Sequence, residues 1–104
     1  MNGTYTKAER EYVEWIKSLP CGVCTGSPPS DAHHIKQGLH FLCIPLCHED
    51  CHQGSFNGIH GQARIWKVKK LDEMKVLNNT IKLYVEHMKQ QGEGKKISRI
   101  FGAG

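Results

Sequence analysis

The chain has 104 residues, which suits one domain and leaves little room for a second. Hydrophobic residues make up 38% of it and charged residues 23%, a balance that excludes a disordered chain. No apolar run approaches the length of about 20 residues that a membrane-spanning helix needs, so no membrane partner is expected. The formal charge of +4 is compatible with binding nucleic acid.

The start of the chain and its cysteine content predict an intracellular protein. Residues 1–4 lack the charged-then-apolar layout of a signal peptide. Five cysteines are an odd number, which argues against a simple disulfide framework. Because a domain of this size buries only a modest core, a bound metal would help it to fold.

The first predicted element is a helix over residues 6–19. Thr6 and Glu9 fit a capping box, in which each side chain bonds an amide at the start of the helix. Apolar side chains then recur at helical spacing. Pro20 is expected to end the helix, because proline cannot continue its hydrogen-bond pattern.

Two short strands are predicted next, over residues 31–35 and 41–46. Pro45 lies inside the second run and lacks an amide hydrogen, so this strand must be an edge strand or carry a bulge. Residues 47–52 are expected to form a tight turn that leads into a short helix. Residues 62–70 show no clear pattern.

A long amphipathic helix is predicted from Asp72 to Gly92, with these two residues as its cap and its end. Its apolar seam consists of Met74, Leu77, Ile81, Tyr84 and Met88. We interpret this seam as a core face or a dimer face. Residues 1–92 therefore form the predicted domain, and residues 93–104 form a basic, Gly-rich tail.

Candidate metal ligands are concentrated in the middle of the chain. The cysteines include two close pairs, Cys21 with Cys24 and Cys47 with Cys51. A turn with two cysteines this close aims both sulfurs at one point, so two such turns predict a tetrahedral cage of four thiolates for Zn²⁺. Four ligands leave no room for a substrate, so the site is expected to be structural.

Two alternatives to this cage stay open. His48 lies between the cysteines of the second pair and can replace one of them as a ligand. The cysteines can also be buried free thiols, or Cys21 and Cys24 can form a redox pair. Cys43 lies inside an apolar run and is expected to be a packed core residue.

The second group of candidate ligands is the adjacent pair His33 and His34, with His52 and His60 further along. Neighbouring strand side chains point to opposite faces, so one imidazole can bind a metal while the other serves as a base. His52 directly follows Cys51, so a zinc cage would fix its position. Glycines before His60 let the chain fold back. The alternative is that these histidines are core or loop residues with hydrogen-bonded rings.

In their order and spacing, these motifs resemble an HNH (ββα-metal) nuclease. More narrowly, residues 6–85 are similar to phage recombination-enhancement nucleases of the Ref (RecA-dependent nuclease) type. The matching stretches are Thr6-Lys7-Ala8-Glu9-Arg10, Cys21-Gly22-Val23-Cys24, Ala32-His33-His34-Ile35, Ile44-Pro45-Leu46-Cys47 and Gly58-Ile59-His60-Gly61. The resemblance implies an α+β fold, in which a small zinc-stabilised ββα-metal core is flanked by an N-terminal and a long C-terminal helix.

The resemblance also implies a role for each matching histidine. His34 is the general base, and His33, His52 and His60 hold a catalytic divalent ion, which is Mg²⁺, Mn²⁺ or Zn²⁺. In the implied reaction His34 takes a proton from water, and the ion stabilises the departing 3′ oxygen. The products then carry a 5′-phosphate and a 3′-hydroxyl.

The chain departs from the family pattern at two places. The phage enzymes have Cys-x-x-His-His where this chain has residues 47–52, which leaves the ligands there open. The middle asparagine of the HNH name has no counterpart between His34 and His52. Asn57 is the candidate for orienting a catalytic group in its place.

The implied substrate is DNA, with Lys67, Lys69 and Lys70 as candidates for holding the flanking backbone. By resemblance alone, the protein acts in DNA recombination or processing in the cytoplasm of a phage's bacterial host, with a RecA-type recombinase filament as a partner. The alternative is a zinc-stabilised module that binds nucleic acid or protein without catalysis. Such a module would not need the four histidines.

Overall fold

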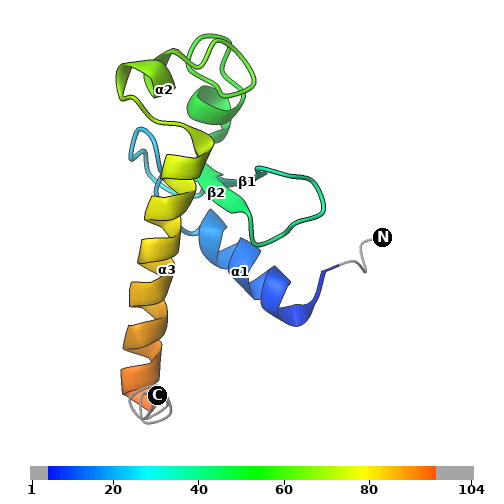
Figure 1. Cartoon of the computed structure of the whole chain (residues 1–104), viewed down its shortest axis with the longest axis vertical. Helices are drawn as coiled ribbons and strands as arrows, with labels where there is room; N and C mark the ends of the chain where they lie inside the picture. The colour runs from blue at the N-terminus through cyan, green and yellow to red at the C-terminus, as the bar shows by residue number, and fades with distance from the viewer. Residues whose placement is uncertain (1–4, 96–104) are drawn as a thin grey trace.

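The computed structural model describes residues 5–95, so residues 1–4 and most of the expected basic tail, residues 96–104, lie outside the described part. The fold is a small α+β arrangement of one two-stranded sheet and several helices (Figure 1). The elements are α1 (Lys7–Lys17), β1 (Asp31–His34), β2 (Cys43–Leu46), the π-helical turn η1 (His48–His52), α2 (Arg64–Val68) and α3 (Glu73–Lys95). Within residues 5–95, none of the helices combines the length and apolar character needed to traverse a bilayer.

Helix α1 begins where the sequence predicts, because both bonds of the capping box form. The Thr6 hydroxyl accepts a hydrogen bond from the Glu9 amide at 3.1 Å, and the Glu9 carboxylate accepts one from the Thr6 amide at 2.7 Å. A cap of this kind stabilises a helix by about 1 kcal/mol. The buried face of α1, which packs against both strands, consists of Tyr12, Val13 and Ile16.

Strands β1 and β2 form an antiparallel hairpin, with His34 opposite Cys43. Both strands of a two-stranded sheet are edges, so Pro45 fits as predicted without breaking a central ladder. The Pro45 carbonyl accepts a hydrogen bond of 2.8 Å from the Gly22 amide. This bond docks the turn that contains the first cysteine pair onto β2.

The core has two parts. The larger cluster surrounds the two cysteine pairs and consists of Cys21, Val23, Ile44, Leu46, Cys51, Trp66, Val76 and Leu77. The smaller cluster lies between α1 and the sheet and consists of Tyr12, Val13, Ile16 and Cys43. The prediction that Cys43 is a packed core residue is therefore confirmed.

Helix α3 starts as predicted, because the Asp72 carboxylate accepts a hydrogen bond of 2.8 Å from the Lys75 amide. The predicted end at Gly92 was wrong, since the helix continues to Lys95. Each glycine inside a helix costs about 1 kcal/mol relative to alanine, and this long helix includes both Gly92 and Gly94 near its end.

As a core face, the predicted seam of α3 is confirmed for only some of its residues, and the dimer face stays a prediction. Leu77 is buried and Tyr84 is half-buried, but Met74, Ile81 and Met88 are exposed. The buried positions of this helix are Val76, Leu77 and Thr80. Figure 1 shows that α3 extends well beyond the hairpin, so only its first turns can be covered by the larger core cluster.

Candidate metal centres

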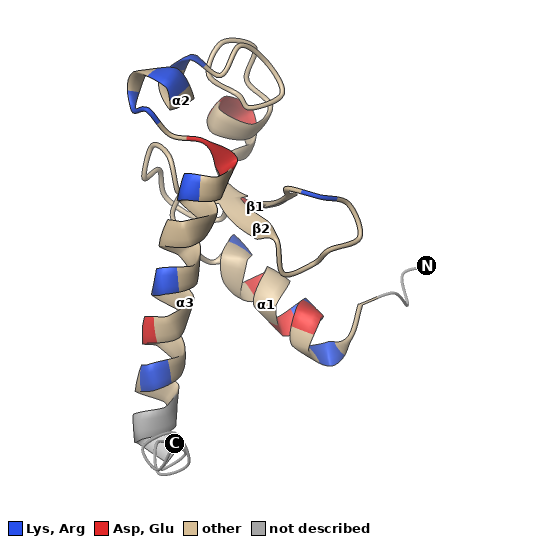
Figure 2. Ribbon diagram, in the orientation of Figure 1, with Lys and Arg blue, Asp and Glu red and all other residues tan. Residues whose placement is uncertain are grey.

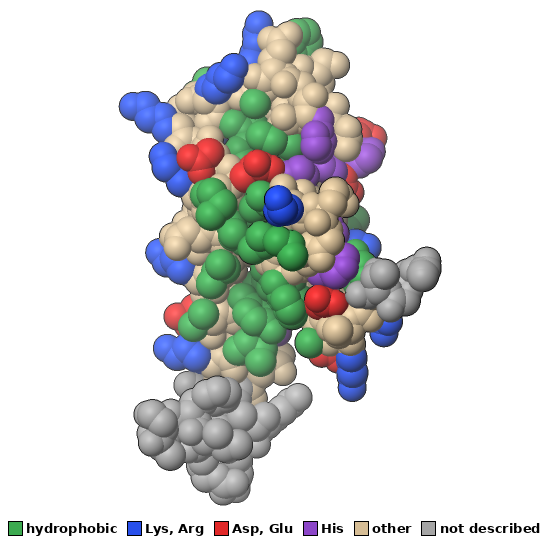
Figure 3. All heavy atoms as spheres, turned by 45° about the vertical axis from the view of Figure 1, so that its right-hand side comes forward, with side chains coloured by type: hydrophobic (Ala, Val, Ile, Leu, Met, Phe, Trp, Pro, Cys, Tyr) green, Lys and Arg blue, Asp and Glu red, His purple; other side chains and the backbone are tan. Residues whose placement is uncertain are grey.

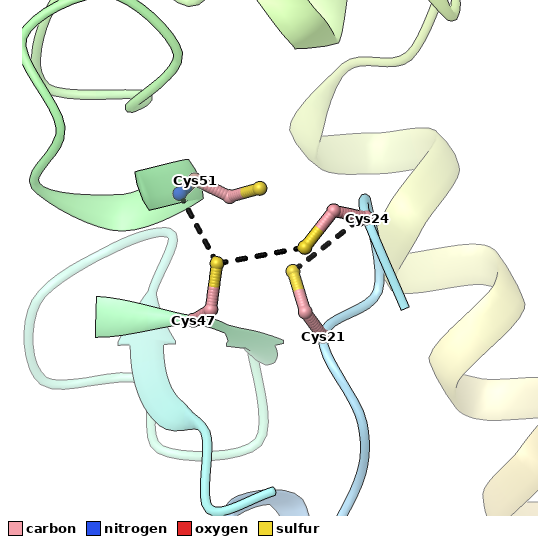
Figure 4. A group of neighbouring side chains, drawn as sticks. All are labelled: Cys21, Cys24, Cys47 and Cys51. Atoms are coloured by element: carbon pink, nitrogen blue, oxygen red, sulfur yellow. Dashed lines mark hydrogen bonds between the residues drawn. The ribbon is translucent and has the colours of Figure 1, made fainter. Parts of the chain in front are cut away.

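The four cysteines of the two pairs meet at one point. Figure 4 shows their side chains converging from the turn before β1, the end of β2 and η1. Their sulfurs all lie within 4.8 Å of one another, and the Sγ atoms of Cys24 and Cys47 are 3.6 Å apart. Thiolates about 2.3 Å from a tetrahedral Zn²⁺ have sulfurs about 3.8 Å apart, so the cluster can hold a metal ion. All five cysteines are free thiols, without disulfide bonds.

Backbone amides in this cluster favour negatively charged sulfur. The amides of Val23 and Cys24 lie 3.4 and 3.5 Å from the Cys21 Sγ, and the Cys51 amide lies 3.3 Å from the Cys47 Sγ. Burial alone would raise the pKa of the Cys21 thiol, but hydrogen bonds from neighbouring backbone amides lower it below its ordinary value. A thiol with a lowered pKa gives up its proton to a metal more readily.

Two members of the cysteine cluster are buried, and Cys24 and Cys47 are half-buried. Cys21 is 2% exposed and Cys51 is fully buried, and both belong to the larger core cluster. A metal ion held here would therefore be structural. His48 is not part of this cluster, because its Nδ1 lies 2.6 Å from Oδ2 of Asp31. The possibility that His48 replaces a cysteine ligand is thus not supported.

His33, His52 and His60 form a second cluster, as the metal-site prediction expected. One ring nitrogen from each lies within 4.8 Å of the others. The ring centroids are 5.0 Å apart for His33–His52, 5.2 Å for His33–His60 and 5.0 Å for His52–His60. The surface view shows histidine side chains gathered on one face of the molecule, next to acidic groups (Figure 3).

Three different segments supply these rings: β1, the end of η1 and the loop after η1. The position of His52 is set by Cys51, its neighbour in the cysteine cluster. The amide of His60 bonds the His52 carbonyl at 3.3 Å, so the loop returns to η1. A Cβ on Gly58 would lie 2.5 Å from the backbone of Gly54, so only glycine permits this return.

Two carboxylates determine which nitrogen of each ring carries a proton. The Nε2 of His33 lies 2.6 Å from Oε2 of Glu73, and the Nδ1 of His52 lies 2.8 Å from Oδ2 of Asp31. A carboxylate can only accept, so these nitrogens donate. In each neutral ring the lone pair is then on the other nitrogen, the Nδ1 of His33 and the Nε2 of His52.

These two lone pairs face each other at 3.1 Å, which is repulsive unless a cation lies between them. Two nitrogens about 2.1 Å from one metal ion are about 3.0–3.4 Å apart at octahedral or tetrahedral angles. Burial lowers the pKa of His33 below its ordinary value, although the Glu73 carboxylate partly offsets this effect. The residues of the histidine cluster therefore fit a divalent metal ion.

His34 does not join the histidine cluster. Its Nε2 lies 3.1 Å from the Nδ1 of His40, whose ring packs against Tyr5 at a centroid distance of 4.0 Å. Alternation along β1 places His34 on the face opposite His33. Burial, followed by repulsion from a protonated His40, lowers the pKa of His34, so the ring stays neutral to lower pH than an ordinary histidine.

Asp31, Glu73 and His40 contact the histidines, yet the sequence did not single them out. A signal existed for Asp31, because it lies two positions before His33 and thus on the same face of the strand. Glu73 lies forty positions from His33, and no local pattern links the two. For His40, the turn that brings it back to His34 is visible only in the structure.

Asn57 and Lys69 contact groups other than those that their predicted roles require. The Asn57 amide donates to the Asp50 carboxylate at 3.0 Å, so it orients that group instead of a histidine. The Lys69 ammonium donates to the Val23 carbonyl at 2.6 Å and helps to hold α2 against the first cysteine turn. The other two lysines proposed to hold DNA are exposed.

The chain was also compared with known proteins. No protein-family model, curated protein or solved structure matches it. The geometry of the two clusters is therefore the basis for assigning a function.

Proposed function

We propose that this protein is a metal-dependent endonuclease of the HNH type, which hydrolyses phosphodiester bonds in DNA. The observation that carries the proposal is the 3.1 Å distance between Nδ1 of His33 and Nε2 of His52, with a ring nitrogen of His60 beside them. A module that only binds would need the buried cysteine cluster but not a second, more open ligand set. His33 is 7% exposed, the His52 side chain is 14% exposed, and His60 is more than a third exposed. The cluster therefore opens toward solvent on the side of His60.

The order of the elements supports the same proposal. A short hairpin carries His33 and His34, and a helical turn after it carries His52. The resemblance to HNH nucleases implies this order of a hairpin, a helical element and metal-binding histidines. The cysteine cluster at the base of the hairpin corresponds to the structural zinc that the same resemblance implies.

A divalent ion held by the histidine cluster would polarise the scissile phosphate and stabilise the departing oxygen. The resemblance assigns His34 the role of general base, which accepts a proton from the attacking water, and this assignment rests on the resemblance alone because His34 lies on the face of β1 opposite His33. The lowered pKa of His34 keeps it neutral, and hence able to accept that proton, at cellular pH. His40 is placed to hold the His34 ring in one orientation through their 3.1 Å contact.

The charge distribution favours DNA as the substrate. Figure 2 shows Lys and Arg along α2 and, with acidic residues among them, along one side of α3, and the chain carries a formal charge of +4. Such a surface binds the phosphate backbone with little dependence on sequence. Following the resemblance, we place this activity in phage or host DNA recombination, with a RecA-type filament as a candidate partner.

The test is a nicking assay on supercoiled plasmid with Mg²⁺ or Mn²⁺. We expect nicking that EDTA stops and that His34→Ala abolishes, while circular dichroism shows an unchanged fold. His87→Gln is the matched control, because His87 packs against Trp15 at 5.4 Å and lies outside the cluster. Binding of DNA without cleavage under every metal tested would favour the non-catalytic module.

A further inference from the structure

The contact between His33 and Glu73 joins the histidine cluster to a distant helix. Glu73 lies in the first turn of α3, and its Oε2 is 2.6 Å from the Nε2 of His33. The His33 side chain is 7% exposed and that of Glu73 is 33% exposed, so water competes little for the imidazole. A hydrogen bond this short to a carboxylate is a strong one.

We propose that Glu73 is a positioning residue of the histidine cluster, setting its affinity for a divalent cation through His33. The inference rests on the proposed function, because it takes the cluster to be a metal site. By accepting the Nε2 proton, Glu73 keeps the lone pair on Nδ1 and holds the ring with that atom toward His52. A carboxylate in this place also makes the ligand nitrogen more basic.

The position of Glu73 is itself set by the core. Val76 and Leu77, on the next turn of α3, are 1% and 5% exposed and belong to the larger core cluster. The Asp72 carboxylate caps the helix just before Glu73. Cation affinity therefore depends on how the first turns of α3 dock, although α3 supplies no ligand in this scheme.

A simpler role for Glu73 must be separated from this one. A carboxylate in the first turn of a helix is stabilised by the helix dipole, without any histidine. That role predicts a small loss of stability on substitution and no change in cation affinity. Asp31 is a less clean probe of positioning, because it accepts from both His48 and His52.

The test measures Mn²⁺ affinity, by electron paramagnetic resonance, in full-length protein already loaded with one Zn²⁺. Mn²⁺ prefers nitrogen and oxygen ligands and leaves a thiolate cage alone. We expect Glu73→Ala to weaken Mn²⁺ binding by about 10–100-fold, as for other partners of metal-bound histidines. Glu73→Gln should show a smaller loss, because its amide oxygen still accepts the Nε2 proton.

Glu86→Gln is the matched control, because Glu86 is an exposed glutamate further along α3. The Mn²⁺ affinity of this variant should equal that of the wild type. Nitrogen NMR of the His33 ring is a second measurement, because it detects the proton on Nε2. In Glu73→Ala this proton has lost its carboxylate acceptor, so its signal should disappear through exchange with water. Should Glu73→Ala fail to fold, Glu73→Gln decides through both measurements.

Equal affinity in wild type and the folded Glu73 variants would overturn the positioning role and leave the nuclease proposal standing. Absence of Mn²⁺ binding in the wild type would overturn both.

Discussion

The indole Nε1 of Trp66 donates a hydrogen bond of 3.1 Å to the backbone carbonyl of Cys51. Trp66 is 2% exposed and Cys51 is fully buried, so this bond lies inside the larger core cluster. The cysteine cluster and the apolar core are consequently one unit. Four thiolates brought together here would repel one another without a cation.

Removing the metal from the cysteine cluster should unfold the protein. A structural zinc contributes about 10–16 kcal/mol in small domains, which matches or exceeds the whole stability of a typical domain. We expect a strong chelator to abolish helical circular dichroism and to shift the emission of Trp66 to the red. Trp15→Phe removes the second indole, so the signal reports Trp66 alone. Zinc added back should restore both signals, whereas a fold that persists in chelator would exclude a structural metal.

Cys43 should differ from the other four cysteines in its response to substitution. It is fully buried in the smaller core cluster, and burial raises the pKa of its thiol to about 11. Cys43→Ala should keep the tightly bound zinc and lose about 1–2 kcal/mol of stability from the small cavity. Cys47→Ala should lose the zinc. Metal analysis of both purified variants checks this, and zinc loss in Cys43→Ala would mean that the ligand set is wrong.

Gly58→Ala should damage the histidine cluster. The new Cβ would meet backbone atoms of Gly54 at 2.5 Å and the His52 carbonyl at 2.8 Å, so the loop that carries His60 must move. We expect weaker Mn²⁺ binding and a stability loss of about 1–3 kcal/mol, measured by titration and thermal melting.

Gly38→Ala is the matched control for that loop. At Gly38, with φ of +86°, a Cβ would meet nothing within 4 Å. Its cost should be limited to about 1–2 kcal/mol of backbone strain, with unchanged Mn²⁺ affinity. Equal affinities in the two glycine variants would argue against a role for the tight loop.

The pH dependence of nicking should report the His34–His40 pair. Burial, and then repulsion from His40, lowers the pKa of His34 below its ordinary value of 6.5. Because only the neutral ring accepts a proton, activity should persist below pH 6.5 and fall as pH drops through the lowered pKa. His40→Ala removes the repulsion and some of the burial, so the acid limb of kcat/KM should move to higher pH. If the acid limb of kcat/KM does not move in His40→Ala, the group that titrates in this limb is not His34.

Local signals in the sequence predicted much of the fold. The capping box of α1 and the Asp72 cap of α3 involve bonds that span three residues, so the sequence alone reveals them. Helix α2 was missed because Ala63, in the left-handed conformation with φ of 54°, caps it without any side-chain hydrogen bond. A helix that begins in this way has no capping side chain from which the sequence could predict its start.

The sequence by itself indicated that the four cysteines converge, because two close pairs imply this through spacing, whereas the resemblance was needed to group His33, His52 and His60 as candidate ligands. Only the tertiary structure decided which carboxylate meets which ring. The contacts of Glu73 with His33 and of His40 with His34 depend on how α3 and the turn between the strands dock. It also decided which turns of α3 are buried, since a helix with apolar residues on several faces does not specify which of them meets the core. The physical reason is the same in each case: covalent spacing constrains near neighbours, whereas contacts between distant residues are chosen by packing.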